Sequence, residues 1–146
     1  MKRLKYVSQW AQEFDRDSID KLVAQAAEKN AELGITGILM TSGRLFFQVI
    51  EGPAAEIDAL YEIISNDERH VDVLLLNAEE NVKTRIFPDW SMRKVDLDSS
   101  SDERLQPVRD LLVEVHDIRL ALEEKTHNLE RAIWSELAAL LSKSSD

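Results

Sequence analysis

The sequence predicts an α+β fold in which two helices cross over one face of a small sheet. The first observation is a strand at residues 45–52, which is rich in β-branched and aromatic residues and is followed by Pro53. The second is the element order strand, helix, strand, strand, helix, strand, with a fifth strand added near Trp90. This order is the ferredoxin-like pattern. Because such crossovers are right-handed, we expect both helices on the same side of the sheet.

The strand at residues 45–52 is expected to be central, because both of its faces are apolar. Leu45, Phe47 and Val49 share one face, and Gln48 lies between two apolar residues on the other. A buried amide without a partner costs about 1–3 kcal/mol, so Gln48 needs hydrogen bonds. Either a neighbouring backbone group supplies them or Gln48 belongs to a binding site.

The N-terminal third predicts a strand, a loop and a helix. Residues 3–8 alternate as in a strand and place Tyr6 on one face, and residues 9–16 are polar and predict a loop. Acidic residues near Asp15 suit a helix N-terminus. Apolar positions with helical spacing follow: Ile19, Leu22, Val23, Ala26 and Ala27. Asn30 is the next position on that face, so it either caps the helix end or joins a buried polar group.

The middle of the chain predicts a hairpin, a helix and two more strands. Residues 35–40 form a strand and 41–43 a turn into the Gln48 strand. Pro53 suits the first turn of a second helix, whose apolar stripe is Ile57, Leu60, Tyr61 and Ile64. Residues 71–76 predict a fourth strand, 77–86 a loop and 90–95 the fifth strand.

The C-terminal part predicts a linker followed by helices. Pro107 suits the first turn of a long helix. Residues spaced by alternating three and four form a heptad seam: Leu105, Val108, Leu112, Val115, Arg119, Leu122, Thr126, Leu129 and Ile133. Thr and Asn propagate helices poorly, so an interruption is expected at 126–128. The seam predicts either a coiled-coil-like homodimer, which we favour because the seam exceeds the length of one small sheet, or two helices folded back on their own domain.

Composition narrows the classes of function. The net charge is −10 with scattered Lys and Arg, which argues against nucleic acid or anionic membranes as partners. The chain has no cysteine, which excludes disulfides and thiolate metal sites. Its three histidines are scattered, so neither a metal cluster nor a catalytic triad is expected. The start lacks the apolar segment of a signal peptide, and a cytoplasmic location is the default expectation.

Three polar side chains are expected to converge. If the C-terminal helices cover the Leu45 face, Gln48 faces the two crossover helices together with Tyr6 and Asn30. A phenol and two amides are neither strong acids nor nucleophiles, but they suit the polar edge of a flat heteroaromatic ligand.

At these residues the sequence resembles the BLUF family of blue-light receptors that bind FAD. The matching motifs span roughly residues 1–97: Tyr6-Val7-Ser8, Asn30, Gly34-Ile35-Thr36-Gly37, Phe46-Phe47-Gln48-Val49-Ile50-Glu51-Gly52, Asp67-Glu68-Arg69-His70 and Phe87-Pro88-Asp89-Trp90-Ser91-Met92. The resemblance implies a BLUF-like domain at 1–97, a linker at 98–106 and a helical extension at 107–146 for dimerisation and output. Asp96-Leu97-Asp98 and the helix after it resemble the extension of photoactivated adenylate cyclases.

The resemblance also implies the contacts of a non-covalent FAD. Asn30 would bond the pyrimidine edge of the ring, and Gln48 would lie between the ring and the Tyr6 hydroxyl. The ring would lie between Leu22 and Ile64, and three residues would face its polar end and ribityl chain: Asp67, Arg69 and His70. Lys29 occupies a position that varies in the family, often Asn, His or Arg.

The mechanism implied by the resemblance is a light-driven electron and proton transfer from Tyr6 to the flavin, after which the Gln48 amide stays rearranged. Trp90 and Met92 would pass the change to the C-terminal helices, and from there to a partner or a fused effector such as a nucleotide cyclase. The chain would be a sensor and not an enzyme. The alternatives are a dimeric ferredoxin-like small-molecule-binding module without photochemistry and a small phosphatase, for which no glycine-rich phosphate loop is found.

Overall fold

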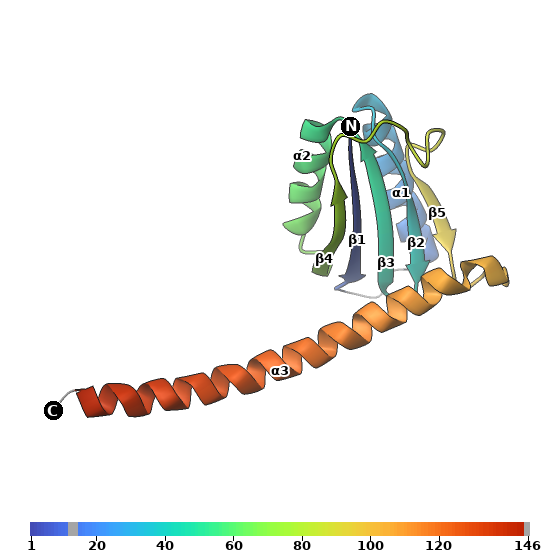
Figure 1. The fold of residues 1–146 in the computed structure, drawn as a ribbon. Coiled ribbons are helices and arrows are strands. Elements are labelled where there is room, and N and C mark those ends of the chain that lie inside the picture. Colours follow the sequence, from blue (N-terminus) through green and yellow to red (C-terminus); the bar gives the residue numbers. More distant parts are fainter. Residues whose placement is uncertain (12–14, 145–146) are drawn as a thin grey trace. The chain divides into compact units, whose positions relative to one another are not determined.

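The computed structural model describes residues 1–11 and 15–144, and its architecture is α+β (Figure 1). The elements are β1 (Lys2–Trp10), α1 (Arg16–Glu32), β2 (Thr36–Ser42), β3 (Leu45–Gly52), α2 (Ala54–Ser65), β4 (His70–Glu79), β5 (Arg93–Asp96), the 3-10 turn η1 (Glu103–Leu105) and α3 (Gln106–Ser144). The sheet order is β4-β1-β3-β2-β5, so β3 is the middle strand. The predicted fold class is confirmed. Within the predicted loop 9–16 and extension 107–146, residues 12–14 and 145–146 lie outside the described part.

The strand register places Gln48 directly beside Tyr6. The strands β1 and β3 pair antiparallel with Tyr6 opposite Gln48, and on the other side of β3 Gln48 is opposite Leu39 of β2. Opposed residues of neighbouring strands share a face of the sheet. Tyr6, Gln48 and Leu39 therefore form a row across the middle of the sheet.

The ends of the two crossover helices are fixed by their flanking residues. Asp15 caps α1, and its carboxylate accepts a hydrogen bond of 2.7 Å from the Ser18 N–H. After α1 the chain turns at Gly34, whose φ of +68° favours glycine. Pro53 is the N-cap of α2, one position before the predicted first turn.

The core on the helix side of the sheet consists of two clusters. Tyr6 belongs to one, together with buried Leu4, Ile35, Ile50 and Ile57. The second contains Trp10, Leu39 and Phe46, with Leu22 of α1 packed against it. Met92 packs against both clusters, so the residue just before β5 lies at their junction.

Several predicted boundaries are wrong. The strand β4 continues through residues 77–79, which were predicted as loop, because Glu79 pairs with Arg3 of β1 in the sheet and through an ion pair. The strand β5 begins at Arg93, so Trp90 and Met92 precede it. The helix α3 runs through 126–128 without interruption, because the preference of single residues is worth at most about 0.7 kcal/mol each and good helix formers flank them.

The chain divides into two compact units, Met1–Leu112 and Val113–Asp146. The first turns of α3 belong to the first unit, where Leu112 is buried and the Arg109 guanidinium donates hydrogen bonds to the Leu97 and Ser100 carbonyls. In the second unit, the described residues form the rest of α3. None of the helices within residues 1–11 and 15–144 is both long enough and apolar enough to cross a bilayer.

Candidate functional site

A cavity of about 430 Å³ lies between α1 and α2 above the sheet. Its volume is in the range of small-molecule and cofactor sites. The walls are mainly apolar, and a smaller number of polar side chains also line the cavity. The lining residues are Trp10, Leu22, Val23, Gln25, Ala26, Lys29, Asn30, Leu33, Leu39, Phe46, Gln48, Glu56, Ala59, Leu60, Ile63, Ile64, Asp67, Arg69, His70 and Met92.

At the floor of the cavity, Gln48 connects Tyr6 to Met92. The Tyr6 hydroxyl donates a hydrogen bond to Gln48 Oε1, and Gln48 Nε2 donates to Met92 Sδ at 3.6 Å. Tyr6 is completely buried, and its ring meets Tyr61 edge to face at 5.5 Å. Burial raises the pKa of the Tyr6 phenol well above its usual value. The hydroxyl therefore keeps its proton at neutral pH and orients the amide.

Asn30 ties the cavity to the segment before β5. It is 3% exposed, and its Nδ2 donates a hydrogen bond of 2.9 Å to the Ser91 carbonyl. The Gly37 N–H donates to the neighbouring Trp90 carbonyl at 2.8 Å. An amide also has a second N–H and a carbonyl oxygen, both of which can bind a ligand in the cavity.

The polar end of the cavity is formed by the turn between α2 and β4. The Arg69 side chain bonds to Asp67, which lowers the pKa of the Asp67 carboxyl to about 2. His70 stacks on Trp10 at 4.8 Å, and its Nδ1 lies 3.2 Å from Ser8 Oγ. Burial lowers the pKa of His70, the Arg69 charge adds to this effect, and Asp67 opposes it. His70 is therefore neutral at pH 7, while Arg69 is charged.

The structure brings most of the predicted site residues to this cavity. The predicted residues that line it are Leu22, Lys29, Asn30, Gln48, Ile64, Asp67, Arg69, His70 and Met92. Tyr6 reaches the cavity through Gln48. Trp90 instead stacks on Phe87 at 5.7 Å and lies 4.5 Å below the Arg93 guanidinium. Met92, and not Trp90, is thus the residue that contacts Gln48.

Trp10 is a cavity residue that the sequence reasoning missed. It is 2% exposed and packs edge to face on Phe46 at 5.0 Å. Trp10 lies four residues after Tyr6, so both point to the same face of β1. The predicted strand ended at Ser8 and therefore did not include Trp10. A strand two residues longer would have revealed it.

The residues around the cavity fit a flat heteroaromatic cofactor with a polar tail. Leu22 and Ile64 come from the two opposite helices and leave a slot between apolar walls. Gln48 at the floor and Asn30 on the wall supply amide donors and acceptors, and the charged side chains of the lining include Lys29 and the Arg69–Asp67 pair. A flavin nucleotide has this combination of an apolar ring, a hydrogen-bonding edge and phosphates.

Comparison with known proteins agrees with this chemistry. The family model described as "BLUF: Sensors of blue-light using FAD" matches residues 1–93. A photoactivated adenylate cyclase subunit beta of Euglena gracilis is 35% identical over 101 residues, which are 68% of this chain and 12% of that protein. The blue light- and temperature-regulated antirepressor BluF of Escherichia coli (strain K12) is 33% identical over 93 residues, 63% of this chain and 23% of that one. The chain therefore spans only a small part of the length of these curated relatives.

Solved structures give the same result. A bacterial light-regulated adenylyl cyclase superposes with a TM-score of 0.74 at 33% identity, over 85% of this chain and 36% of that chain. The dark-state structure of BlrB, a BLUF protein, superposes with a TM-score of 0.61 at 39% identity, over 65% of this chain and 71% of that chain.

Proposed function

Because the chain belongs to the BLUF family of blue-light sensors that use FAD, we propose that it senses blue light through FAD held without a covalent bond between α1 and α2. The observation that carries the proposal is the hydrogen-bonded chain from Tyr6 through Gln48 to Met92 at the cavity floor. These two hydrogen bonds join a buried phenol to an amide that faces the cavity.

The residues around the cavity have separate roles in binding. Asn30 binds the hydrogen-bonding edge of the ring, because it is a buried amide on the cavity wall. Leu22 and Ile64 enclose the ring between the two helices. Arg69, held by Asp67, faces the polar end of the cofactor together with His70, and Lys29 adds a positive charge to the lining.

Gln48 is the switch. FAD, when bound, supplies the blue-light absorption and a site that accepts an electron. Tyr6 gives up an electron and its hydroxyl proton and then takes both back, which leaves the Gln48 amide rotated or tautomerised. Because the two ends of an amide differ, the rearranged Gln48 offers a different donor to the ring and a different partner to Met92. A stronger hydrogen bond to the ring shifts its absorption to the red.

The output leaves the cavity through the segment before β5. Met92 contacts Gln48, and Ser91 contacts Asn30, so a rearranged amide changes the contacts of this segment directly. We assign α3 to homodimerisation and output, with the catalytic activity in a partner or a fused effector such as a nucleotide cyclase. This chain is the sensor, and its cytoplasmic location stays a prediction from the sequence.

The test is the absorption spectrum of the purified protein in the dark and after blue light. A flavin spectrum that shifts to the red and recovers in the dark is the expected result. The cofactor is then released by acid precipitation and weighed by mass spectrometry, which identifies FAD or FMN and shows that no covalent bond holds it. A protein that stays colourless after incubation with FAD would contradict the proposal and leave a ferredoxin-like module without photochemistry.

A further inference from the structure

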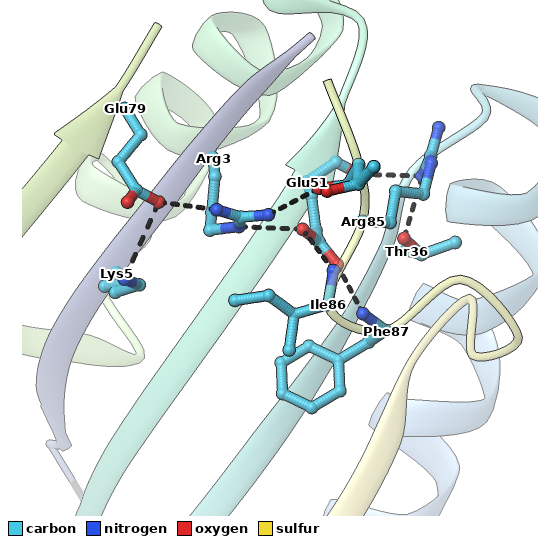
Figure 2. Close-up of polar contacts among 9 residues, drawn as sticks. Arg3, Lys5, Thr36, Glu51, Glu79, Arg85, Ile86 and Phe87 are labelled. Carbon is cyan, nitrogen blue, oxygen red and sulfur yellow. Dashed lines mark hydrogen bonds and ion pairs between the residues drawn. The ribbon is translucent and has the colours of Figure 1, made fainter. Parts of the chain in front are cut away.

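A completely buried carboxylate, Glu51, lies on the face of the sheet opposite the cavity (Figure 2). Gln48 and Glu51 are three positions apart on β3, so their side chains point to opposite faces. A buried carboxylate costs several kcal/mol unless charged and hydrogen-bonding groups surround it. Such a residue has a specific structural task, which its partners identify.

The partners of Glu51 lie in the segment between β4 and β5. Its Oε1 accepts a hydrogen bond from the Phe87 N–H at 2.6 Å, and its Oε2 accepts from the Ile86 N–H at 3.1 Å. Arg3 Nε donates to the same Oε2 at 2.8 Å. Arg3 also donates to the Thr84 carbonyl at 2.7 Å. Glu51 and Arg3 together therefore hold the backbone of residues 84–87 against β1 and β3.

Only a carboxylate satisfies this arrangement. Three N–H groups point at Glu51, and they occupy both of its oxygens. A glutamine at this position has one oxygen, and its NH₂ group would face another donor. The structure therefore uses the charge and both oxygens of Glu51, and an amide of the same shape would lose at least one of the three hydrogen bonds.

Arg85 fixes the same segment from its other side (Figure 2). Its guanidinium donates to Thr36 Oγ1 at 2.8 Å, to the Glu51 carbonyl at 3.1 Å and to the Gly34 carbonyl at 2.7 Å. Gly34 follows the C-terminus of α1, the helix that carries Asn30. The segment is thus attached to β2, to β3 and to the turn after α1.

The fixed part of the segment is connected to the switch. Phe87 stacks on Trp90, and the Trp90 and Ser91 carbonyls accept hydrogen bonds from Gly37 and Asn30. Met92 then meets Gln48. Residues 80–92 contain neither helix nor strand, so ordering them costs backbone entropy, and discrete anchors must supply the opposing free energy.

We propose that Glu51 is a positioning residue of the switch, whose hydrogen bonds to Ile86 and Phe87 hold the segment so that Met92 stays against Gln48 in the dark. The inference rests on the proposed function for its consequence in light, but not for its geometry. Weakening the anchor frees Met92 without substituting any residue that lines the cavity, because Glu51 points away from the cavity.

The test compares Glu51→Gln with the unchanged protein, both as purified with their cofactor. The chain has three methionines, so labelling with ¹³C-methyl methionine gives a simple spectrum in which Met92 reports on its contact with Gln48. We expect the Met92 signal of Glu51→Gln to shift or broaden, while Met40, on the outer face, keeps its position. The recovery of the dark spectrum should change in rate by about tenfold, which corresponds to one lost hydrogen bond of about 1.4 kcal/mol.

Lys5→Gln is the matched control. Lys5 lies on the same strand as Arg3 and belongs to the same ion-pair group through Glu79 at 3.6 Å (Figure 2), but Glu79 is on β4 and not on the segment. This variant should leave the Met92 signal and the recovery rate unchanged. A Lys5→Gln effect as large as that of Glu51→Gln would overturn the specific role of Glu51.

Hydrogen exchange of the Ile86 and Phe87 amides measures whether the anchor itself is released. Faster exchange of the Ile86 and Phe87 amides with an unchanged Met92 signal would overturn the proposal, because the anchor would then be released without moving the switch. If Glu51→Gln does not fold, Arg85→Leu serves instead, since Arg85 is half-buried and fixes the same segment, and leucine adds no further methionine signal. A wild-type protein without a light response would contradict the proposed function alone, and the Met92 signal in the dark would still decide whether Glu51 positions the segment.

Discussion

Gln48 bonds to Tyr6 and Met92 and also lines the cavity, and this position follows from the strand register. Because Tyr6 lies directly opposite on β1, the two side chains meet on one face without any loop to place them. A switch built on two paired strands has little freedom in the positions of its Cα atoms. Only the amide torsion and its protons remain free to change.

We expect Gln48→Leu to keep the cofactor but to lose the light-induced red shift. Leucine has a similar volume and fills the cavity floor, but it cannot exchange a donor for an acceptor. The measurement is the absorption spectrum before and after blue light. Gln9→Leu, the same substitution on the adjacent strand and outside the cavity lining, is the control and should shift normally. A normal red shift in Gln48→Leu would remove the assigned role.

The pH dependence of stability should include a contribution from His70. Its pKa is lowered in the folded protein, so the folded state binds fewer protons than the unfolded state below the unfolded value of 6.5. The free energy of unfolding therefore falls as the pH drops from 6.5 through the lower pKa of the folded state. Urea unfolding of the wild type and of His70→Gln between pH 8 and 5 measures this difference. Parallel curves for the two proteins would contradict the prediction.

At the residue scale, the sequence predicted the residues that meet at the cavity and missed Glu51, which holds the segment before β5. Periodicity placed Asn30 and Gln48 on the side of the two crossover helices, on the condition that the C-terminal helices cover the Leu45 face, and it allowed Tyr6 to share that side. The task of Glu51 was not predictable, because its partner Arg3 is 48 positions away and its backbone partners lie in a segment without periodicity. Hydrogen bonds to backbone N–H groups of such an aperiodic segment leave no signature in the sequence, unlike the helix cap at Asp15.

At the scale of elements, the close approach of β2 and β3 depends on Gly37. A Cβ at this position would lie 2.1 Å from the Val49 carbonyl oxygen, which belongs to the backbone and cannot move aside. The Gly37 N–H also bonds to Trp90, so a shift of β2 would move the segment before β5. The glycine therefore serves both the sheet and the site.

We expect Gly37→Ala to lower the free energy of unfolding by at least about 2 kcal/mol, because the clash forces two backbones apart. Gly43→Asn is the control: its φ of +56° suits asparagine, and nothing lies within 4 Å of an added Cβ. The control should change stability by less than about 1 kcal/mol. Urea unfolding gives the free energy of unfolding of both variants. Equal values for Gly37→Ala and Gly43→Asn would show that β2 adjusts freely and would contradict the prediction.

The elements themselves were largely predictable, and their ends were less so. The two helices and the hairpin of β2 and β3 follow from periodicity, glycines and Pro53, which act locally. The end of β4 pairs with β1, and Glu79 also forms an ion pair with Arg3 of that strand, which the local pattern does not show, so the run 77–79 was predicted as loop. Local patterns give the elements, whereas pairing between distant residues decides where they end.

At the scale of the whole molecule, the long helix α3 bears on the oligomeric state. The helix α3 runs for 39 residues, and the predicted seam continues along it through Leu122 and Leu129. A helix of this length with a heptad pattern is typical of coiled coils. The homodimer is therefore a prediction from the seam, to which the structure adds that the helix is continuous.

We expect Leu122→Lys combined with Leu129→Lys to convert a dimer into a monomer, because paired lysines on the seam would repel and lose apolar contacts. Leu120→Lys places one such charge on the same helix outside the seam and should stay dimeric. Light scattering after gel filtration of the full chain gives the mass of each protein. A wild-type monomer, or a double variant that stays dimeric, would contradict the seam.

The complete burial of Tyr6 has a further consequence for what this protein can report. In the proposed mechanism Tyr6 starts the response, and because its phenol loses its proton only far above neutral pH, changes in acidity near neutral pH do not alter this group. The step that we propose for Tyr6 is therefore separated from changes in the acidity of the surrounding solution.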